Sequence, residues 1–178
     1  YYRVASLGNN GITGYYSNEV SGAPHNLVLS VPYDYSTIQS ALDASFDGDS
    51  ILVNDGIYIE NLIWPQLDNI TIQSVNGPDS TFIDGSGDAA SCIYVGNGQE
   101  GVVIDGFTVM NGYGSLSTFH SSIKWGGGIL IDENVLASIV NCKIINNGDY
   151  GTENEDEIRG GGISVHANSQ VIIEDCII

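Results

Sequence analysis

A short apolar segment recurs along this chain at a spacing of about 35 residues. The copies are 102–111 (VVIDGFTVMN), 137–146 (ASIVNCKIIN) and 171–178 (VIIEDCII), so the steps are 35 and 34 residues. A second motif, Gly-Gly-Gly-Ile, begins at residue 126 and returns 34 residues later at residue 160. A fixed period in the thirties indicates a solenoid, in which each repeated unit contacts only its neighbours.

Stacking the repeats aligns residues of the same kind. The repeats alternate in steps of two and are rich in β-branched side chains, which predicts half-buried strands. No helical periodicity accompanies them, which excludes helical and leucine-rich solenoids. The aligned columns are Ile104–Ile139–Ile173, Phe107–Cys142–Cys176 and Val109–Ile144–Ile178, and we expect the first two to face the core. The predicted fold is therefore all-β, a right-handed parallel β-helix over residues 31–178.

Asparagine recurs where the repeated strand ends, at Asn111 and Asn146. This residue tolerates a left-handed backbone, and stacked amides can hydrogen-bond from one coil to the next. We therefore expect both positions to be corners of the coil.

A short helix is predicted where the solenoid begins. Ser36 and Gln39 have the spacing of a capping box, with Ser36 as N-cap. The apolar stripe of a short amphipathic helix follows at Ile38, Ala41 and Leu42. The turn at 47–50 ends the helix, and the first strand is expected from Ile51. Such a helix covers the open end of the core.

These segments resemble the pectin lyase-like β-helix superfamily. The residues that carry the resemblance are Ser36–Asp43, Gly48–Val53, Gly56–Glu60, Asn69–Ile72, Phe82–Gly85 and the corner Asn141–Asn147. The superfamily contains lyases, esterases and hydrolases as well as non-catalytic surface proteins, so the resemblance implies the fold and leaves the activity open. Its lyases use Ca²⁺ with a basic side chain, and its esterases and hydrolases use paired Asp with Arg or His. No such motif is matched here, and no catalytic residue is predicted; His166 is expected to be a surface residue without a partner.

Residues 1–22 are expected to form a separate β-hairpin. Two strand-like runs flank the turn Gly8–Gly11, and the segment resembles the last hairpin of a fibronectin type III domain. The alternative is a disordered leader, because an isolated hairpin is marginally stable in water. Residues 23–30 are then a linker. Because residues 176–178 stop inside a strand, we expect the natural protein to continue.

Charge limits the partners. The chain has 22 Asp and Glu against 4 Lys and Arg, a formal net charge of −18. Such a surface repels nucleic acid and anionic membranes, and it repels acidic polysaccharides unless a divalent cation bridges the two. No apolar run is long enough for a membrane span. The three cysteines, Cys92, Cys142 and Cys176, are too few and too spread for a disulfide framework and are expected to be free thiols.

Two insertions interrupt successive coils at the same place, at 112–125 and 148–159. They are expected to emerge side by side on one edge, where a solenoid commonly binds its partner. Trp125 and Arg159 occupy equivalent positions one coil apart. The candidate ligand-binding residues are Trp125, Arg159, Lys124, His120, Tyr113 and Tyr150. The alternative is that Trp125 covers apolar coil surface and Arg159 neutralises its own acidic loop.

A calcium site is the one cofactor hypothesis. Glu153, Glu155, Asp156 and Glu157 offer the oxygen ligands that Ca²⁺ prefers. Neither EF-hand spacing nor a calcium-binding β-roll repeat is present, and most acidic turns simply face water.

Three functions remain open at this point. The first is a non-catalytic β-helix in a modular secreted or surface protein, acting in adhesion, carbohydrate contact or assembly. The second is the N-terminal part of a polysaccharide lyase or hydrolase whose catalytic coils lie beyond residue 178. The third is a fibre subunit that associates end to end, because strand edges at an uncapped end can stack on another copy. All three place the protein outside the cell or on its surface, with a polysaccharide or another surface protein as partner.

Overall fold

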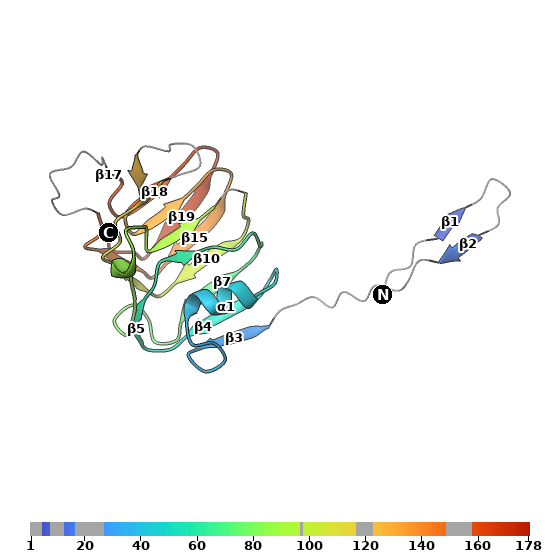
Figure 1. Ribbon diagram of the computed structural model, residues 1–178, viewed down its shortest axis with the longest axis horizontal. Helices are drawn as coiled ribbons and strands as arrows, with labels where there is room; N and C mark the ends of the chain where they lie inside the picture. The colour runs from blue at the N-terminus through green and yellow to red at the C-terminus, as the bar shows by residue number, and fades with distance from the viewer. Residues whose placement is uncertain (1–4, 8–12, 17–26, 97, 117–122, 149–157) are drawn as a thin grey trace.

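The chain forms a parallel β-helix of three stacked sheets (Figure 1). The computed structural model describes residues 5–7, 13–16, 27–96, 98–116, 123–148 and 158–178. The largest sheet has the order β19-β15-β10-β7-β4-β3. Its strands are β3 (Val28–Val31), β4 (Ser50–Val53), β7 (Thr71–Ser74), β10 (Val102–Asp105), β15 (Leu136–Val140) and β19 (Gln170–Glu174).

Two four-stranded sheets complete each coil. One has the order β16-β11-β8-β5 and the other β18-β14-β9-β6. The first contains β5 (Gly56–Ile59), β8 (Thr81–Asp84), β11 (Thr108–Met110) and β16 (Lys143–Ile145). The second contains β6 (Leu62–Ile63), β9 (Ile93–Val95), β14 (Ile129–Ile131) and β18 (Ile163–Val165). Pairing within all three sheets is parallel, as the repeat predicts.

The predicted columns are present in register. Ile104 pairs with Ile139, and Ile139 pairs with Ile173. Ile104 and Ile139 are fully buried, as is Phe107 in the neighbouring column. Ile173 keeps the register but is 43% exposed, because β19 is an edge strand of its sheet. Ile178 is exposed in the same last coil. The expected inward packing is therefore complete only where the described chain places a strand on both sides.

A helix covers one end of the core, one residue later than the capping box predicted. α1 (Ile38–Ala44) has Thr37 as its N-cap, and the box is formed with Ser40. Gln39, expected to close the box, instead bonds the backbone of Ile63. The predicted apolar stripe is correct, because Ile38, Ala41 and Leu42 are the buried residues of the helix.

The Glu60 carboxylate accepts hydrogen bonds from the backbone N–H groups of Ile38 and Gln39, at 3.0 and 2.9 Å. A negative charge stabilises the first turn of a helix, because the N–H groups there have no partner within the helix. Glu60 follows β5, so this contact ties α1 to the next coil.

The sheet begins before the predicted boundary. β3 pairs in parallel with β4, so residues 28–30, expected in the linker, are part of the solenoid. At the other end of the linker, β1 (Ala5–Leu7) and β2 (Thr13–Tyr16) pair antiparallel, as expected of a hairpin. No helix in the described part of the chain is both long and apolar enough to cross a membrane.

Asparagine residues form corners of the coil as predicted. Asn111 and Asn146 have φ values of 63° and 54°, in the left-handed region. The backbone N–H of Asn111 donates to the carbonyl of Asn146 at 3.1 Å, while its side chain bonds Asp84. An amide-to-amide contact occurs instead at another corner, where Asn168 Nδ2 donates to Asn134 Oδ1 at 3.3 Å.

The three cysteines are free, as predicted. Cys142 and Cys176 stack on neighbouring coils, and the backbone N–H of Cys142 lies 3.4 Å from the Cys176 sulfur. Burial raises the pKa of the Cys92 thiol to about 12 and that of Cys142 to about 11.

Candidate functional site

The two insertions lie side by side, as their equal placement in the repeat predicts. Their described residues form a sheet with the order β12-β13-β17, from β12 (Ser115–Leu116), β13 (Lys124–Trp125) and β17 (Ile158–Arg159). Trp125 pairs with Arg159 across the parallel strands β13 and β17, one coil apart. We call these three strands the insertion sheet.

Glycines allow the two insertions to leave the coils in close contact. The Gly148 N–H donates to the Gly112 carbonyl at 2.8 Å. A Cβ added at Gly112 would lie 2.0 Å from the Gly127 carbonyl oxygen and 2.7 Å from the Cys92 sulfur. Neither of these buried neighbours has room to move, because one is backbone and the other lies in the core. The glycine-rich motif therefore serves the close approach of three chain segments at this edge.

The candidate ligand-binding residues divide into two groups. Trp125 and Lys124 are partly buried in β13, Tyr113 is 41% exposed, and the backbone of Arg159 lies beside Trp125. His120 and Tyr150 lie outside the described residues. The predicted calcium ligands Glu153, Glu155, Asp156 and Glu157 also lie outside them. Within the residues that the structure describes, no three His, Cys, Asp or Glu side chains gather as a metal site would require.

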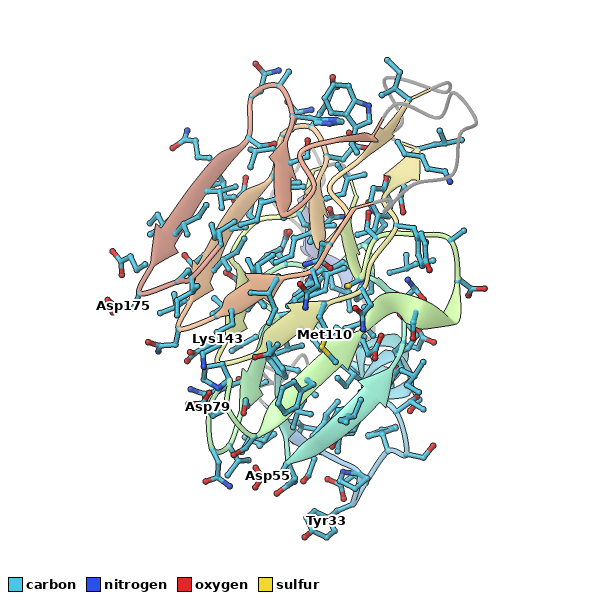
Figure 2. All side chains as sticks on the ribbon, turned by 90° about the vertical axis from the view of Figure 1, so that its left-hand side faces the viewer. Tyr33, Asp55, Asp79, Met110, Lys143 and Asp175 are labelled. Carbon is cyan, nitrogen blue, oxygen red and sulfur yellow. The ribbon has the colours of Figure 1, made fainter. Side chains whose placement is uncertain are left out.

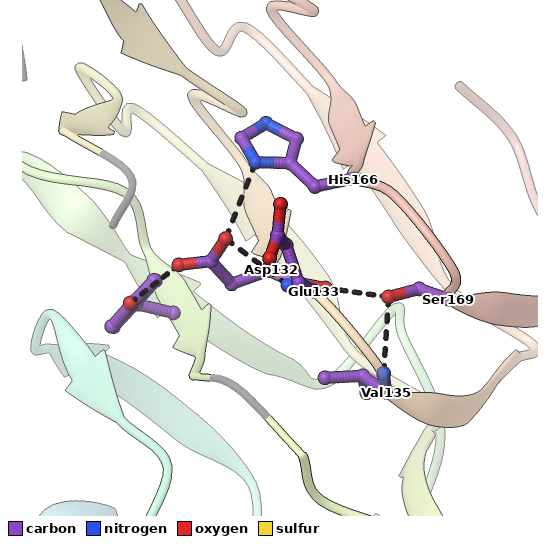
Figure 3. Close-up of polar contacts among 6 residues, drawn as sticks. Asp132, Glu133, Val135, His166 and Ser169 are labelled. Atoms are coloured by element: carbon purple, nitrogen blue, oxygen red, sulfur yellow. Dashed lines mark hydrogen bonds and ion pairs between the residues drawn. The ribbon is translucent and has the colours of Figure 1, made fainter. Parts of the chain in front are cut away.

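A buried carboxylate lies near the insertion sheet. Asp132 follows β14 and is fully buried. Its Oδ2 accepts a hydrogen bond from the Tyr94 hydroxyl at 2.9 Å, and its Oδ1 accepts from the Glu133 N–H at 3.1 Å. His166 Nδ1 lies 3.3 Å from the same Oδ1 (Figure 3). These contacts supply the partners that a carboxylate needs when it is removed from water.

Burial raises the pKa of Tyr94 to about 12, together with the hydrogen bond to Asp132 and the charge of that carboxylate. The Tyr94 hydroxyl therefore keeps its proton at neutral pH and remains a donor to Asp132. We call Tyr94, Asp132 and His166 the carboxylate cluster.

His166 is not the unpartnered surface residue that we expected. Its side chain is 9% exposed, and its ring packs edge-on against Trp125 with the ring centroids 4.9 Å apart. The Asp132 carboxylate favours a proton on Nδ1, so Nε2 of the neutral ring is a hydrogen-bond acceptor. Within the described part of the chain, this buried Nε2 has no hydrogen-bond partner.

The repeat contained a signal for this contact. Asp132 and His166 each stand six residues after the start of a Gly-Gly-Gly-Ile motif, and those motifs are 34 residues apart. Continuing the alignment of Ile131 with Val165 by one residue places Asp132 next to His166. The residue types differ between the two coils, so a search for similar residues did not show it.

An open pocket lies beside the insertion sheet and has a volume of about 310 Å³. Leu116 of β12 and Ile63 of β6 line it and are exposed, so their apolar side chains are accessible. The other lining residues are Asn61, Leu62, Asp88, Ala90, Ser91, Tyr94 and Ser115. The pocket thus combines two accessible apolar side chains with amide, hydroxyl and carboxylate groups.

Hydrogen bonds hold the lining of this pocket in place. The Asn61 amide donates to the Ser91 carbonyl at 3.1 Å, and the Ser91 N–H donates to the Ser115 hydroxyl at 2.9 Å. The Ser91 hydroxyl in turn donates to the Trp125 carbonyl at 3.2 Å. The coils and both sides of the first insertion are therefore linked around one pocket, which reduces the ordering cost of binding.

Fold and sheet order define this chain as a parallel β-helix protein. The sequence matches no protein-family model and no curated protein. Among solved structures, it is similar to the pectin methylesterase from Aspergillus niger, with a TM-score of 0.50 and 17% identity. The match covers 89% of this chain and 57% of that one, so the chain spans a little over half the length of the enzyme. Identity this low shows the shared fold alone.

Proposed function

We propose that this chain is a non-catalytic, carbohydrate-contacting β-helix of a modular secreted or surface protein. The observation that carries the proposal is the pocket between the coils and the insertion sheet. A sugar ring has apolar C–H faces and a polar edge of hydroxyl groups. Leu116 and Ile63 offer apolar contacts for such a face, and Asp88 offers an exposed acceptor for hydroxyl groups.

The charge of the chain supports a neutral glycan as the ligand. A net charge of −18 repels uronic-acid polymers at low ionic strength. A divalent cation is needed to bridge an acidic glycan to this surface. We therefore expect neutral oligosaccharides to bind without added metal, and oligogalacturonate to bind only in the presence of Ca²⁺.

Calorimetric titration with neutral hexasaccharides from cellulose, xylan and mannan tests the proposal. At least one is expected to bind, and Leu116→Ser is expected to weaken that binding at least fivefold. The matched control is Ile172→Ser, which removes an equally exposed side chain from the largest sheet. Both variants should melt within a few degrees of the wild type. Absence of binding by all three sugars, or equal binding by Leu116→Ser, contradicts the proposed site.

The buried Nε2 of His166 favours a second candidate, a polysaccharide-degrading enzyme. A histidine oriented by a carboxylate, with the other nitrogen unpaired, has the arrangement of a general base. Chromatography of the same oligosaccharides after incubation tests this function. An enzyme releases shorter products, and His166→Gln abolishes their release while the protein stays folded. No product formation leaves the binding function as the account of this face.

A further inference from the structure

The outer face of the sheet β16-β11-β8-β5 exposes apolar side chains to solvent. Ile57 and Ile59 of β5 are 65% and 64% exposed, and Ile145 of β16 is also exposed. The register places Ile57 beside Phe82, while Ile59, Asp84, Met110 and Ile145 follow one another across the four strands. Figure 2 looks onto this face, with Met110 at one end of its strand and Lys143 at the start of the next.

The corresponding positions of the largest sheet are mostly polar. Outward positions there include Ser50, Thr71 and Ser138 in one row and Gln73 and Asp105 in the next. Hydroxyl, amide and carboxylate groups are the residues expected on a sheet face that meets water. A contiguous group of exposed isoleucines is unusual on such a face and marks an interaction surface.

Carboxylates accompany these apolar side chains. Asp84 lies within the face, between Ile59 and Met110, while Asp55 and Asp79 are exposed at its edge. Burial tends to raise the pKa of Asp84, but hydrogen bonds from Ser86 and Asn111 outweigh it and lower the pKa. Asp84 is therefore ionised at neutral pH. Lys143 forms an ion pair with Asp79, so the cation of β16 is already neutralised.

We propose that this face binds a protein segment in which apolar residues alternate with Lys or Arg. The apolar residues of the segment would cover the isoleucines, and its cations would meet the carboxylates of Asp55 and Asp84. A second copy of this chain does not fit, because it would bring like charges together at the same contacts and carries a net charge of −18. This surface is separate from the pocket beside the insertion sheet, so the inference does not depend on the proposed carbohydrate function.

The probe is a fluorescently labelled peptide of ten residues in which valine and lysine alternate, with blocked termini. We expect it to bind the wild-type chain, measured by fluorescence anisotropy, and to bind at least fivefold more weakly to the double variant Ile57→Ser/Ile59→Ser. Asp55→Asn/Asp84→Asn is expected to weaken binding at low salt, with a smaller effect at high salt because salt screens exposed charges. Ile172→Ser, altered on another sheet, should bind like the wild type.

Thermal melting shows whether the variants are folded, and exposed isoleucines are expected to tolerate serine with little change. Failure of the peptide to bind the wild type overturns the proposal, as does equal binding by the double serine variant. A peptide with glutamate in place of lysine should not bind, and equal binding of that peptide contradicts the charge argument. Sedimentation velocity provides the remaining outcome: a dimer that Ile57→Ser/Ile59→Ser dissociates would make a second copy the occupant.

Discussion

The inner and outer rows of the sheet β18-β14-β9-β6 follow different rules. The inward row consists of Ile93, Ile129 and Ile163, the same residue on three successive coils. The next row, one residue along each strand, consists of Tyr94, Leu130 and Ser164. Inside, every coil has the same neighbours above and below, so the same shape fits each time. Outside, each coil meets a different surrounding, and the residues are free to differ.

Partner binding and chemistry depend on the outer rows. The carboxylate cluster, the insertion sheet and the apolar face of β16-β11-β8-β5 all lie on the outside of the coils. None of them repeats from coil to coil. Repetition in this molecule therefore specifies the fold, and departures from repetition indicate where to look for function.

Ile139→Asp should have the largest effect and tests the inner rule. It places a charge in a fully buried column between two stacked coils, which costs several kcal/mol without a partner. We expect the variant to be unfolded, with no cooperative transition in a thermal melt. The control is Ser138→Asp, one residue earlier on the outer face, which should melt close to the wild type. Similar melting of both variants would mean that the two faces of β15 are not distinguished in this way.

Asp132→Ala should have an intermediate effect and tests an outer cluster that is nevertheless buried. It removes the acceptor of the Tyr94 hydroxyl and the partner of His166 Nδ1. Buried donors left without acceptors cost about 1–3 kcal/mol, so the free energy of unfolding in urea should fall by about that amount. Glu133→Ala keeps the backbone donor to Asp132 and should change it by less than about 0.5 kcal/mol. Equal losses would show that the carboxylate cluster does not stabilise the fold.

The buried thiol of Cys92 should have the smallest effect, confined to alkaline pH. Its pKa in the folded chain is about 12, against an ordinary value of 9.0. A group with a raised folded pKa contributes its full stability below the ordinary value and loses it as the pH rises toward 12. Between pH 9 and 12, it should lower the free energy of unfolding by about 1.4 kcal/mol per pH unit.

Subtracting the curve of Cys92→Ala isolates this contribution, because Tyr94 and Cys142 titrate in the same direction. The less buried Cys176 provides the comparison on the native protein, where a thiol reagent at pH 8 should modify it first. Parallel curves for the wild type and Cys92→Ala, or faster modification of Cys92 than of Cys176, would contradict the protected position of Cys92.

Much of the fold was predictable because a solenoid makes its long-range contacts at a constant separation along the chain. The columns, the parallel pairing and the common origin of the two insertions all follow from one offset. Predictions that depended on local chemistry alone were less exact. Ser36 and Thr37 are both suitable N-caps, and the Ser40 side chain selects Thr37. β3 was missed because its four residues have no counterpart in the repeat.

By itself, the sequence determined the coil, its register and the edge from which the insertions leave. It did so because equal spacing places equivalent residues on neighbouring coils, whatever surrounds them. Tertiary structure alone decided that His166 is buried against Trp125 and that Asp132 orients it. It also decided that the isoleucines of β5 are left uncovered. Both outcomes depend on which chain segments cover the outside of a coil, and no periodicity in the sequence encodes that.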